Sequence, residues 1–477
     1  MSRRRLLLFV LLIIAAAAIY YFMDGQKEKK AVEPVSTVGV IDEAMGIIQE
    51  KGVYPVDGDK LVEGALRGMA DVIGDPYSTY LTADEAAAHK ESLAGERIGI
   101  GAEITRTNGK FIIVAPIKAS PADKAGLQPY DEIIRVDGES VSADTLQGVV
   151  QRIRGKKGTT VVMTIYRPDL NKHIEVSVLR DTIAMKTVSK ELITVKERKI
   201  GYISITSFGE ETAKEWASAT EKLLSDGAEA LIIDVRGNPG GYLHSVGDIA
   251  GSLLPNDTVY TFMQDADGTM TPLVVEPSEE IKFNVKLEKI PLILLQDKGS
   301  ASASEVLSGA LKDLKRSSIA GTVSFGKGTV QETIDLSNGG EVKLSTHKWL
   351  TPKEKWIHGK GVEPDIKVEQ SELFDEHIRI VAVEYKEGDF NEDVAYAQRL
   401  LKGLGYNIGR DDGYFDAATK HVVKKFREDS KVGSKSEMDG MFYSTLKKQV
   451  ESFRADQEND HQLQMGLDYL SHLIAEE

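Results

Sequence analysis

The chain has 477 residues, of which 41% are hydrophobic and 28% are charged. At ~150 residues per domain this length suggests about three domains. The composition excludes a wholly disordered chain, a collagen-like fibre and a polytopic membrane protein. Lys and Arg number 59 against 74 Asp and Glu, a net charge of −15, so we expect no nucleic-acid partner. The absence of cysteine excludes disulfides, a thiol nucleophile and a thiolate metal site.

The N-terminus predicts a single membrane-spanning segment. Three arginines (Arg3–Arg5) precede the uncharged apolar run Leu6–Met23, which is about the length of a transmembrane helix. The positive-inside rule places the rest of the chain outside the cytoplasm. Small residues at Ala15–Ala18 leave cleavage by a signal peptidase open, in which case the protein is secreted. Residues 1–23 are therefore expected to be an anchor or signal, and 24–35 a polar linker.

Residues 36–94 form a predicted helical region. Apolar residues recur at helical spacing, first from Val40 to Ile48 and again from Leu61 to Ile73. Two short amphipathic helices bury little surface alone, so their apolar faces must pack on each other, on the next domain or on a second chain. Packing on a second chain is our hypothesis, and it predicts a homodimer.

Residues 95–182 change to short strands and turns. The segment SPADKAGLQPYDEIIRVDGESV (Ser120–Val141) resembles the middle of a PDZ domain. In that resemblance Gly99, Ile100 and Gly101 occupy the carboxylate-binding loop, where backbone N–H groups meet a peptide terminus. The adjacent strand edge would pair with an extended peptide. Arg167 follows a strand and is either a peptide contact or a solvated surface arginine.

Residues 183–365 have an α/β pattern. The apolar run Leu231–Val235 ends in the glycine-rich turn 236–241, and a second run, Leu292–Leu295, leads into a helix. This strand–loop–helix order places residues 300–305 at a helix N-terminus, where ligand sites of α/β sheets gather.

The C-terminal part contains a further small module. After a connector at 366–390, residues 391–450 show two Asp-Gly-x-Phe turns, each followed by a short helix. This pattern resembles peptidoglycan-binding-like modules of bacterial envelope proteins, so peptidoglycan or an envelope protein is the expected partner. A final helix at 451–477 carries Leu463, Leu467, Leu470 and Ile474 on one face.

The segment GSASASE (299–305) is followed by FGKGTVQ (325–331). With the PDZ-like segment, the Asn-Pro-Gly-Gly turn and DPYSTY (75–80), this resembles the carboxy-terminal processing (tail-specific) serine protease family over residues 36–365. The resemblance implies an α/β core of the ClpP/crotonase-like type and no cofactor or metal. It assigns Ser302 as nucleophile, Lys327 as general base and Gln331 as support for the lysine. Ala303 and either Gly240 or Gly241 match its oxyanion hole.

These residue types suit the chemistry. A serine hydroxyl needs a base within hydrogen-bond reach, and a helix N-terminus stabilises a developing oxyanion. Lysine, with a reference pKa near ~10.4, must be desolvated to act as a base near neutrality. Gln331 is four residues after Lys327, and an even separation in a strand would put both side chains on one face. Its neutral amide oxygen can orient the amine without favouring the charged form.

Other readings remain open from the residues alone. Ser302 and Glu305 form a capping-box sequence, and Ser300 and Ser304 are rival nucleophiles. Lys327 would usually be an exposed turn lysine and Gln331 a solvent-facing strand residue. A Ser–His hydrolase could use His244 or His347, although no G-x-S-x-G elbow accompanies them. A non-catalytic peptide- and wall-binding scaffold is the third alternative.

The sequence thus predicts a membrane-anchored, extracytoplasmic endopeptidase. A Ser–Lys pair would cleave peptide bonds, and the PDZ-like domain would bind the C-terminus of a protein substrate. Because the binding module directly precedes the catalytic one, we expect peptide binding to gate the catalytic site.

Overall fold

The computed structural model describes residues 38–476 except 94–95, 108, 118–119, 185, 279–280, 282–284, 377–380 and 382. The chain divides into two compact units, Met1–Tyr80 and Leu81–Glu477. The expected anchor at 1–23 and linker at 24–35 lie outside the described residues. Within the described part, no helix is long and apolar enough to cross a membrane.

The first unit contains the two helices expected from the apolar spacing, α2 (Val38–Lys51) and α3 (Gly58–Asp71). The Asp57 carboxylate caps α3 by accepting a hydrogen bond from the Asp59 amide. Ile47, Ile48 and Met69 remain exposed. Among the described residues, the apolar faces predicted from the sequence are therefore largely uncovered. Strand β1 (Thr79–Leu81) follows α3.

The PDZ region is a small β-rich domain preceded by helix α4 (Ala83–Leu93). Its six-stranded sheet has the order β3-β4-β5-β7-β8, with β6 paired to β5, and β2 pairs separately with β9. The sheet encloses a core that includes Phe111, Ile133 and Met163. Its elements are β2 (Glu96–Gly99), β3 (Ala102–Thr107), β4 (Lys110–Pro116), α5 (Pro121–Lys124), β5 (Glu132–Val136), β6 (Glu139–Ser140), α6 (Leu146–Ile153), β7 (Thr160–Arg167), η1 (Pro168–Leu170), β8 (Lys172–Leu179) and β9 (Asp181–Ala184).

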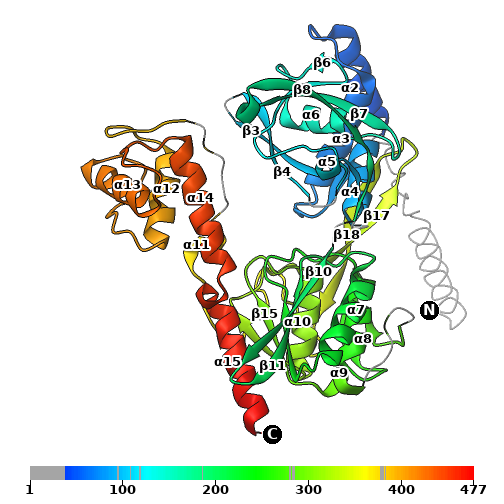
Figure 1. Cartoon of the computed structure of the whole chain (residues 1–477). Coiled ribbons are helices and arrows are strands. Elements are labelled where there is room, and N and C mark those ends of the chain that lie inside the picture. The colour runs from blue at the N-terminus through cyan, green and yellow to red at the C-terminus, as the bar shows by residue number, and fades with distance from the viewer. Residues whose placement is uncertain are drawn as a thin grey trace, which may run out of the picture. The chain divides into compact units, whose positions relative to one another are not determined.

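Residues 188–367 contain a second six-stranded sheet, ordered β10-β11-β12-β15-β16-β19 and parallel from β11 onward (Figure 1). Its strands are β10 (Val188–Val195), β11 (Arg198–Ile205), β12 (Ala230–Asp234), β15 (Leu292–Gln296), β16 (Ser318–Gly321) and β19 (Ile366–Lys367). Both predicted apolar runs are fully buried strands, β12 and β15. Buried parallel strands are apolar on both faces, which explains the absence of alternation in their sequences.

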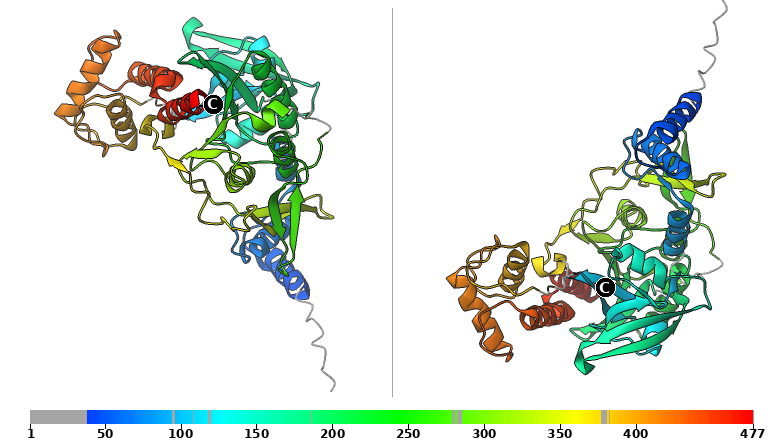
Figure 2. Two further views of the ribbon diagram at one scale, coloured as in Figure 1. Left: turned by 90° about the horizontal axis from the view of Figure 1, so that it is seen from below. Right: turned by 90° about the horizontal axis from the view of Figure 1, so that it is seen from above.

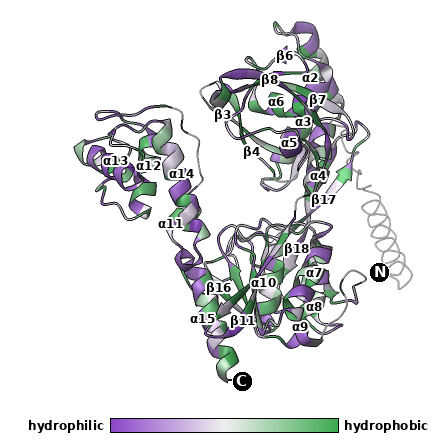
Figure 3. Cartoon of the chain, viewed as in Figure 1, coloured by the Kyte–Doolittle hydropathy of each residue, from purple (hydrophilic) through white to green (hydrophobic). Residues whose placement is uncertain are grey.

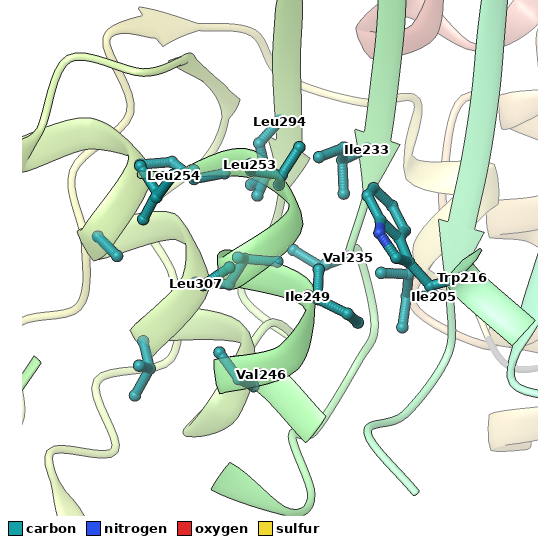
Figure 4. Close-up of a cluster of buried hydrophobic side chains, with 14 of the residues drawn as sticks. Ile205, Trp216, Ile233, Val235, Val246, Ile249, Leu253, Leu254, Leu294 and Leu307 are labelled. Atoms are coloured by element: carbon teal, nitrogen blue, oxygen red, sulfur yellow. The ribbon is translucent and has the colours of Figure 1, made fainter. Parts of the chain in front are cut away.

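The two faces of this sheet are covered differently. On one face Ile233, Leu294 and Trp216 belong to a large core shared with the nearby helices (Figure 4). Those helices are α7 (Thr212–Ser225), α8 (Leu243–Leu253), α9 (Val285–Lys289) and α10 (Ala303–Asp313). On the other face lies the C-terminal helix α15 (His461–Glu476) (Figure 2), and its Leu467 belongs to the same buried cluster as Ile232. Hydrophobic and hydrophilic residues are mixed along this helix (Figure 3).

A second, antiparallel sheet supplies part of the catalytic site. Strand β18 (Glu341–Leu350) pairs with both β13 (Val259–Gln264) and β17 (Thr329–Asp335), and β14 (Met270–Val274) pairs with β13. The loop 322–328 runs from β16 of the parallel sheet into β17.

The C-terminal module is helical. Phe415, Phe426 and Phe442 pack in its core, and Asp416 and Asp439 cap the helices that follow the two Asp-Gly-containing turns. Because the Asp439 carboxylate accepts from the Phe442 amide, the last of these helices begins at Gly440, within the Asp-Gly-x-Phe turn and not after it as expected. The elements are α11 (Glu372–Asp375), α12 (Glu392–Gly403), α13 (Ala417–Asp429), α14 (Gly440–Ala455) and η2 (Gln457–Asn459).

Candidate active site

Ser302 lies at the sharp turn between β15 and α10. Its backbone has φ 53° and ψ −113°, a region that non-glycine residues rarely adopt and that costs ~1–3 kcal/mol. The turn places Ser302 at the N-cap position of α10 and the Ala303 amide at the first helical position. Such local strain is typical of a functional position held by its surroundings.

The turn 236–241 is hydrogen-bonded to the Ser302 loop through Asn238. The Asn238 carbonyl oxygen accepts from the Ala301 amide (3.0 Å) and from the Ser304 hydroxyl (2.9 Å). The Asn238 side-chain oxygen accepts from the Gly240 amide (2.8 Å). The Gly240 N–H therefore already has an acceptor. This distinguishes Gly240 from Gly241, between which the sequence could not choose as the oxyanion-hole glycine.

Gly240 approaches Ser302 closely. A Cβ added at Gly240 would lie 2.9 Å from the Ala303 nitrogen and 2.9 Å from Ser302 Cβ. Glycine at this position therefore keeps open the space in front of the Ala303 amide, as an oxyanion hole requires.

A buried carboxylate joins the serine loop to the lysine loop. Glu305 is fully buried, and its Oε2 accepts from the amides of Ser302 and Lys327, both at 2.8 Å. Its Oε1 accepts from the Gly326 amide and the Ser324 hydroxyl, both at 2.6 Å. The sequence identified Glu305 only as half of a capping box. The structure adds that the same carboxylate bridges two loops.

Lys327 lies in the loop before β17, so the argument from even spacing within one strand is wrong: Gln331 is in the strand and Lys327 is not. The relative position of the Lys327 and Gln331 side chains depends on the loop and on a bulge between Val330 and Gln331. The Lys327 carbonyl oxygen accepts from the Trp349 indole (2.8 Å). The chain approaches Gly328 closely, since a Cβ there would lie 2.9 Å from the His358 backbone nitrogen.

The Gln331 amide is oriented by two hydroxyls. Its Nε2 donates to Thr329 Oγ1 and to Ser345 Oγ, both at 3.0 Å. Since the amide oxygen lies on the opposite side of the group, it is left to accept from another donor.

One cavity of about 540 Å³ gathers the expected side chains. All six predicted residues line it: Ser302, Ala303, Lys327, Gln331, Gly240 and Gly241. Apolar groups, including Phe208, Leu243 and Trp349, form the rest of its wall. The rival nucleophiles are buried and committed elsewhere, Ser300 to the Val235 carbonyl (2.8 Å) and Ser304 to Asn238.

The histidines do not lie where the hypothesis of a Ser–His hydrolase with His244 or His347 requires them. His244 stacks on Tyr242, and His347 pairs with Asp265 (2.9 Å); neither lines the cavity. His89 of α4 does line it, together with Lys343. Burial, and then the charge of Lys343, lower the pKa of His89 below its usual value. The polar sequence around α4 contains no signal that would have identified His89.

The PDZ loop has the expected place in its domain. It follows β2 and precedes β3, the edge strand beside α6. The Ile100 carbonyl accepts from the Ala122 amide (2.7 Å) and the Gly101 carbonyl from the Ile117 amide (2.8 Å). The Ile100 side chain is buried in the core, so this residue can meet a peptide only through its backbone.

Arg167 is not a solvated surface arginine, because its side chain is only 13% exposed. Its Nε and Nη2 donate to the fully buried Asp131 carboxylate, both at 2.7 Å, and Nη2 also donates to the Gly126 carbonyl. Contact with a peptide stays a prediction. In the described part of the chain, no group of three or more His, Asp or Glu is placed to hold a metal ion.

Comparisons with known proteins agree with this architecture. Peptidase family S41 matches residues 199–368, the PDZ domain family 98–178, and the putative peptidoglycan binding domain family 390–432. The N-terminal domain of the activating protease CtpB matches residues 13–85.

Three related proteins are similar to this chain over most of its length. The carboxy-terminal processing protease CtpB of Bacillus subtilis is 41% identical over 90% of this chain and 88% of its own length. CtpA of the same organism is 36% identical, over 93% and 92% of the two chains. A probable CtpA-like serine protease of Staphylococcus haemolyticus is 36% identical over 80% and 74%.

The fold is thus that of a multidomain serine protease with a PDZ domain, an S41 core and a C-terminal peptidoglycan-binding-like domain. The chain belongs to the carboxy-terminal processing protease family of S41 peptidases.

Proposed function

We propose that this chain is an endopeptidase in which Ser302 is the nucleophile and Lys327 the general base. The observation that carries the proposal is the single cavity lined by Ser302, Ala303, Lys327 and Gln331. Its apolar wall favours a dry site, where an uncharged amine is less costly than in water. The Gln331 amide oxygen would accept from that amine and hold it toward Ser302.

In the first half-reaction the Ser302 oxygen attacks the peptide carbonyl carbon while Lys327 takes the hydroxyl proton. The negative oxygen of the tetrahedral intermediate would receive the Ala303 N–H and the Gly241 N–H. We favour Gly241 because the Gly240 amide already donates to Asn238. The carbon–nitrogen bond then breaks, and Lys327 returns the proton to the leaving amine, which leaves an acyl-enzyme.

In the second half-reaction Lys327 takes a proton from water, and the resulting nucleophile attacks the ester. The tetrahedral intermediate collapses with cleavage of the bond to the Ser302 oxygen, which recovers its proton from the lysine. The reaction requires no metal or organic cofactor. The parallel sheet, with its turns at the carboxyl ends of the strands, supports the proposed ClpP/crotonase-like relationship.

The substrate is proposed to be a protein recognised by its C-terminus. Support comes from the PDZ match and from the loop Gly99–Gly101 beside the edge strand β3. Peptide binding there would favour the active arrangement of the Ser–Lys site. Deletion of residues 95–181 that left both rate and substrate choice unchanged would remove the gating part of the proposal.

The cellular setting follows from the remaining parts of the chain. The N-terminal apolar run would anchor the protein, or be cleaved, with the domains outside the cytoplasm. The C-terminal module would bind peptidoglycan or an envelope protein, a proposal supported by its family match. The exposed apolar residues of α2 and α3 support a homodimer.

One experiment compares cleavage of casein and of a C-terminally tagged peptide by five proteins: wild type, Ser302→Ala, Lys327→Ala, His89→Ala and His244→Ala. Loss of activity confined to the serine and lysine variants is expected. Loss with His89→Ala or His244→Ala, at normal melting temperature, would favour a Ser–His hydrolase. No cleavage by any protein, with a PDZ-binding peptide supplied, would favour a non-catalytic scaffold.

A further inference from the structure

A buried ionic cluster lies where the C-terminal helix meets the parallel sheet. Arg236, the first residue of the glycine-rich turn, directs its guanidinium to the sheet face that α15 covers. Its Nη1 and Nη2 each donate to one Asp460 oxygen, both at 2.8 Å. Its Nε and Nη2 also donate to Asp234 at the end of β12. This double-oxygen geometry gives an Arg–carboxylate pair both strength and a defined orientation.

Asp460 is fixed from the C-terminal side as well. The carboxylate accepts from the Leu463 amide (3.0 Å) in the first turn of α15 and from the Gln370 side chain (2.7 Å). Burial alone would raise the pKa of Asp460, but the hydrogen bonds and charge of Arg236 lower it below its usual value. The carboxylate is therefore ionised at neutral pH.

The helix behind Asp460 is firmly docked. Leu463, Leu467 and Leu470 are buried against a cluster that the sheet provides. Because burial of apolar side chains stabilises a docked helix, these three leucines hold the start of α15 in place. Asp460 is thus a fixed point rather than a mobile surface carboxylate.

From Arg236 the connection continues into the catalytic cavity. The next residue, Gly237, donates its amide to Asp297 (2.8 Å), and Asn238 donates its side chain to the Ile205 carbonyl (2.8 Å). Gly240 and Gly241 follow and line the cavity beside Ser302. The turn is held by the Asp297 loop and the β11 end on one side, and by α15, through Asp460, on the other.

We infer that Asp460 is a positioning residue for the catalytic site: through Arg236 it holds the turn that presents Gly240 and Gly241 to Ser302. The inference rests on the proposed Ser–Lys function. It gives Asp460, which lies more than 200 positions after the turn, a role in positioning the site. A 1 Å displacement of an oxyanion donor is enough to reduce a rate substantially.

The test compares full-length Asp460→Asn, Asp460→Ala and Asp460→Glu with Asp468→Asn. Asp468 lies on α15, which begins directly after Asp460, but it is 64% exposed and pairs with the exposed Lys196, so it is a matched control. We expect kcat to fall about 10- to 100-fold for Asp460→Asn and Asp460→Ala with KM little changed. Partial recovery is expected with Asp460→Glu, and no change with Asp468→Asn.

A second readout does not depend on catalysis. Amide hydrogen exchange of residues 237–241, measured in a Ser302→Ala background, should accelerate when Asp460→Asn is added, whereas strands β12 and β15 keep their protection. Unchanged exchange together with unchanged kcat would overturn the inference. Loss of activity in proportion to unfolded protein, with exchange accelerated throughout the sheet, would overturn it equally and leave Asp460 a merely structural residue. If Asp460→Asn accelerates exchange only in the turn but the wild-type protein cleaves no substrate, the result would count against the proposed function and not against the inference.

Discussion

The two walls of the catalytic cavity are built in different ways. The serine wall consists of the Ser302 loop and the turn 236–241, both at the ends of fully buried parallel strands. The lysine wall consists of the loop 322–328 and β17, and it includes the exposed Phe325. Asn238 joins the two segments of the serine wall, whereas the Glu305 carboxylate spans from one wall to the other. The serine wall is thus part of the buried core, whereas the lysine wall borders solvent, and we expect the lysine wall to be the more readily displaced of the two.

The largest effect is expected at the serine wall. Gly240→Ala would place a Cβ 2.9 Å from the Ala303 nitrogen and strain a backbone with φ +104°. We expect kcat to fall by about 10²- to 10³-fold, the usual loss when an oxyanion donor is blocked. Steady-state cleavage of the tagged peptide measures it, with Gly237→Ala, where a Cβ meets nothing within 4 Å, as the control for backbone strain. Equal losses in both variants would mean that strain, not blockage, matters.

The next effect tests the connection between the walls. Glu305→Gln replaces a carboxylate that accepts four hydrogen bonds with an amide whose NH₂ faces two of the donors. We expect the free energy of unfolding to fall by ~2–4 kcal/mol and activity to fall with it. Ser324→Ala, which removes one donor, should cost about 1 kcal/mol. If Glu305→Gln unfolds in denaturant at the wild-type midpoint, the two walls are not held together by this group.

A smaller effect is expected within the lysine wall. Gln331→Ala should lower kcat about 10-fold, since the lysine amine loses a partner that orients it. Gln331→Glu should instead move the acidic limb of the pH–rate profile to higher pH, because a carboxylate favours the charged amine. A pH–rate profile identical to that of wild type would show that the side chain at position 331 does not affect the pKa of the base. Thr333→Ala, which also lines the cavity, is the matched control.

The smallest effect concerns His89. Burial and then the charge of Lys343 lower the pKa of His89 from 6.5, and Glu341 opposes them. Between this lowered pKa and 6.5 the unfolded chain binds more protons at residue 89 than the folded chain does. The contribution of His89 to the free energy of unfolding is therefore fully present above pH 6.5 and decreases as the pH falls. The melting temperature of His89→Gln should therefore depend less on pH between about 5 and 7 than that of wild type. NMR titration of His89 to a pKa at or above 6.5 would contradict this, and His244→Gln is the control.

Local sequence patterns determined much of this protein. The apolar runs before Arg236 and Gln296 predicted buried strands, because a fully buried parallel strand needs no polar alternation. The order strand, loop, helix then placed Ser302 at a helix start, and the family spacing selected it over Ser300 and Ser304. The final helix was also predicted, from the spacing of Leu463, Leu467 and Leu470.

Only the tertiary structure decided which distant groups meet. Glu305 reaches Lys327 across 22 positions, His89 enters the cavity from a polar helix, and Asp460 reaches Arg236 across 224 positions. Periodicity reports which face of one element is apolar, but a single buried carboxylate or guanidinium leaves no periodic trace. Its partner is set by how the chain folds back, so the links that hold the serine, the lysine and the oxyanion turn together come from packing and not from neighbouring sequence.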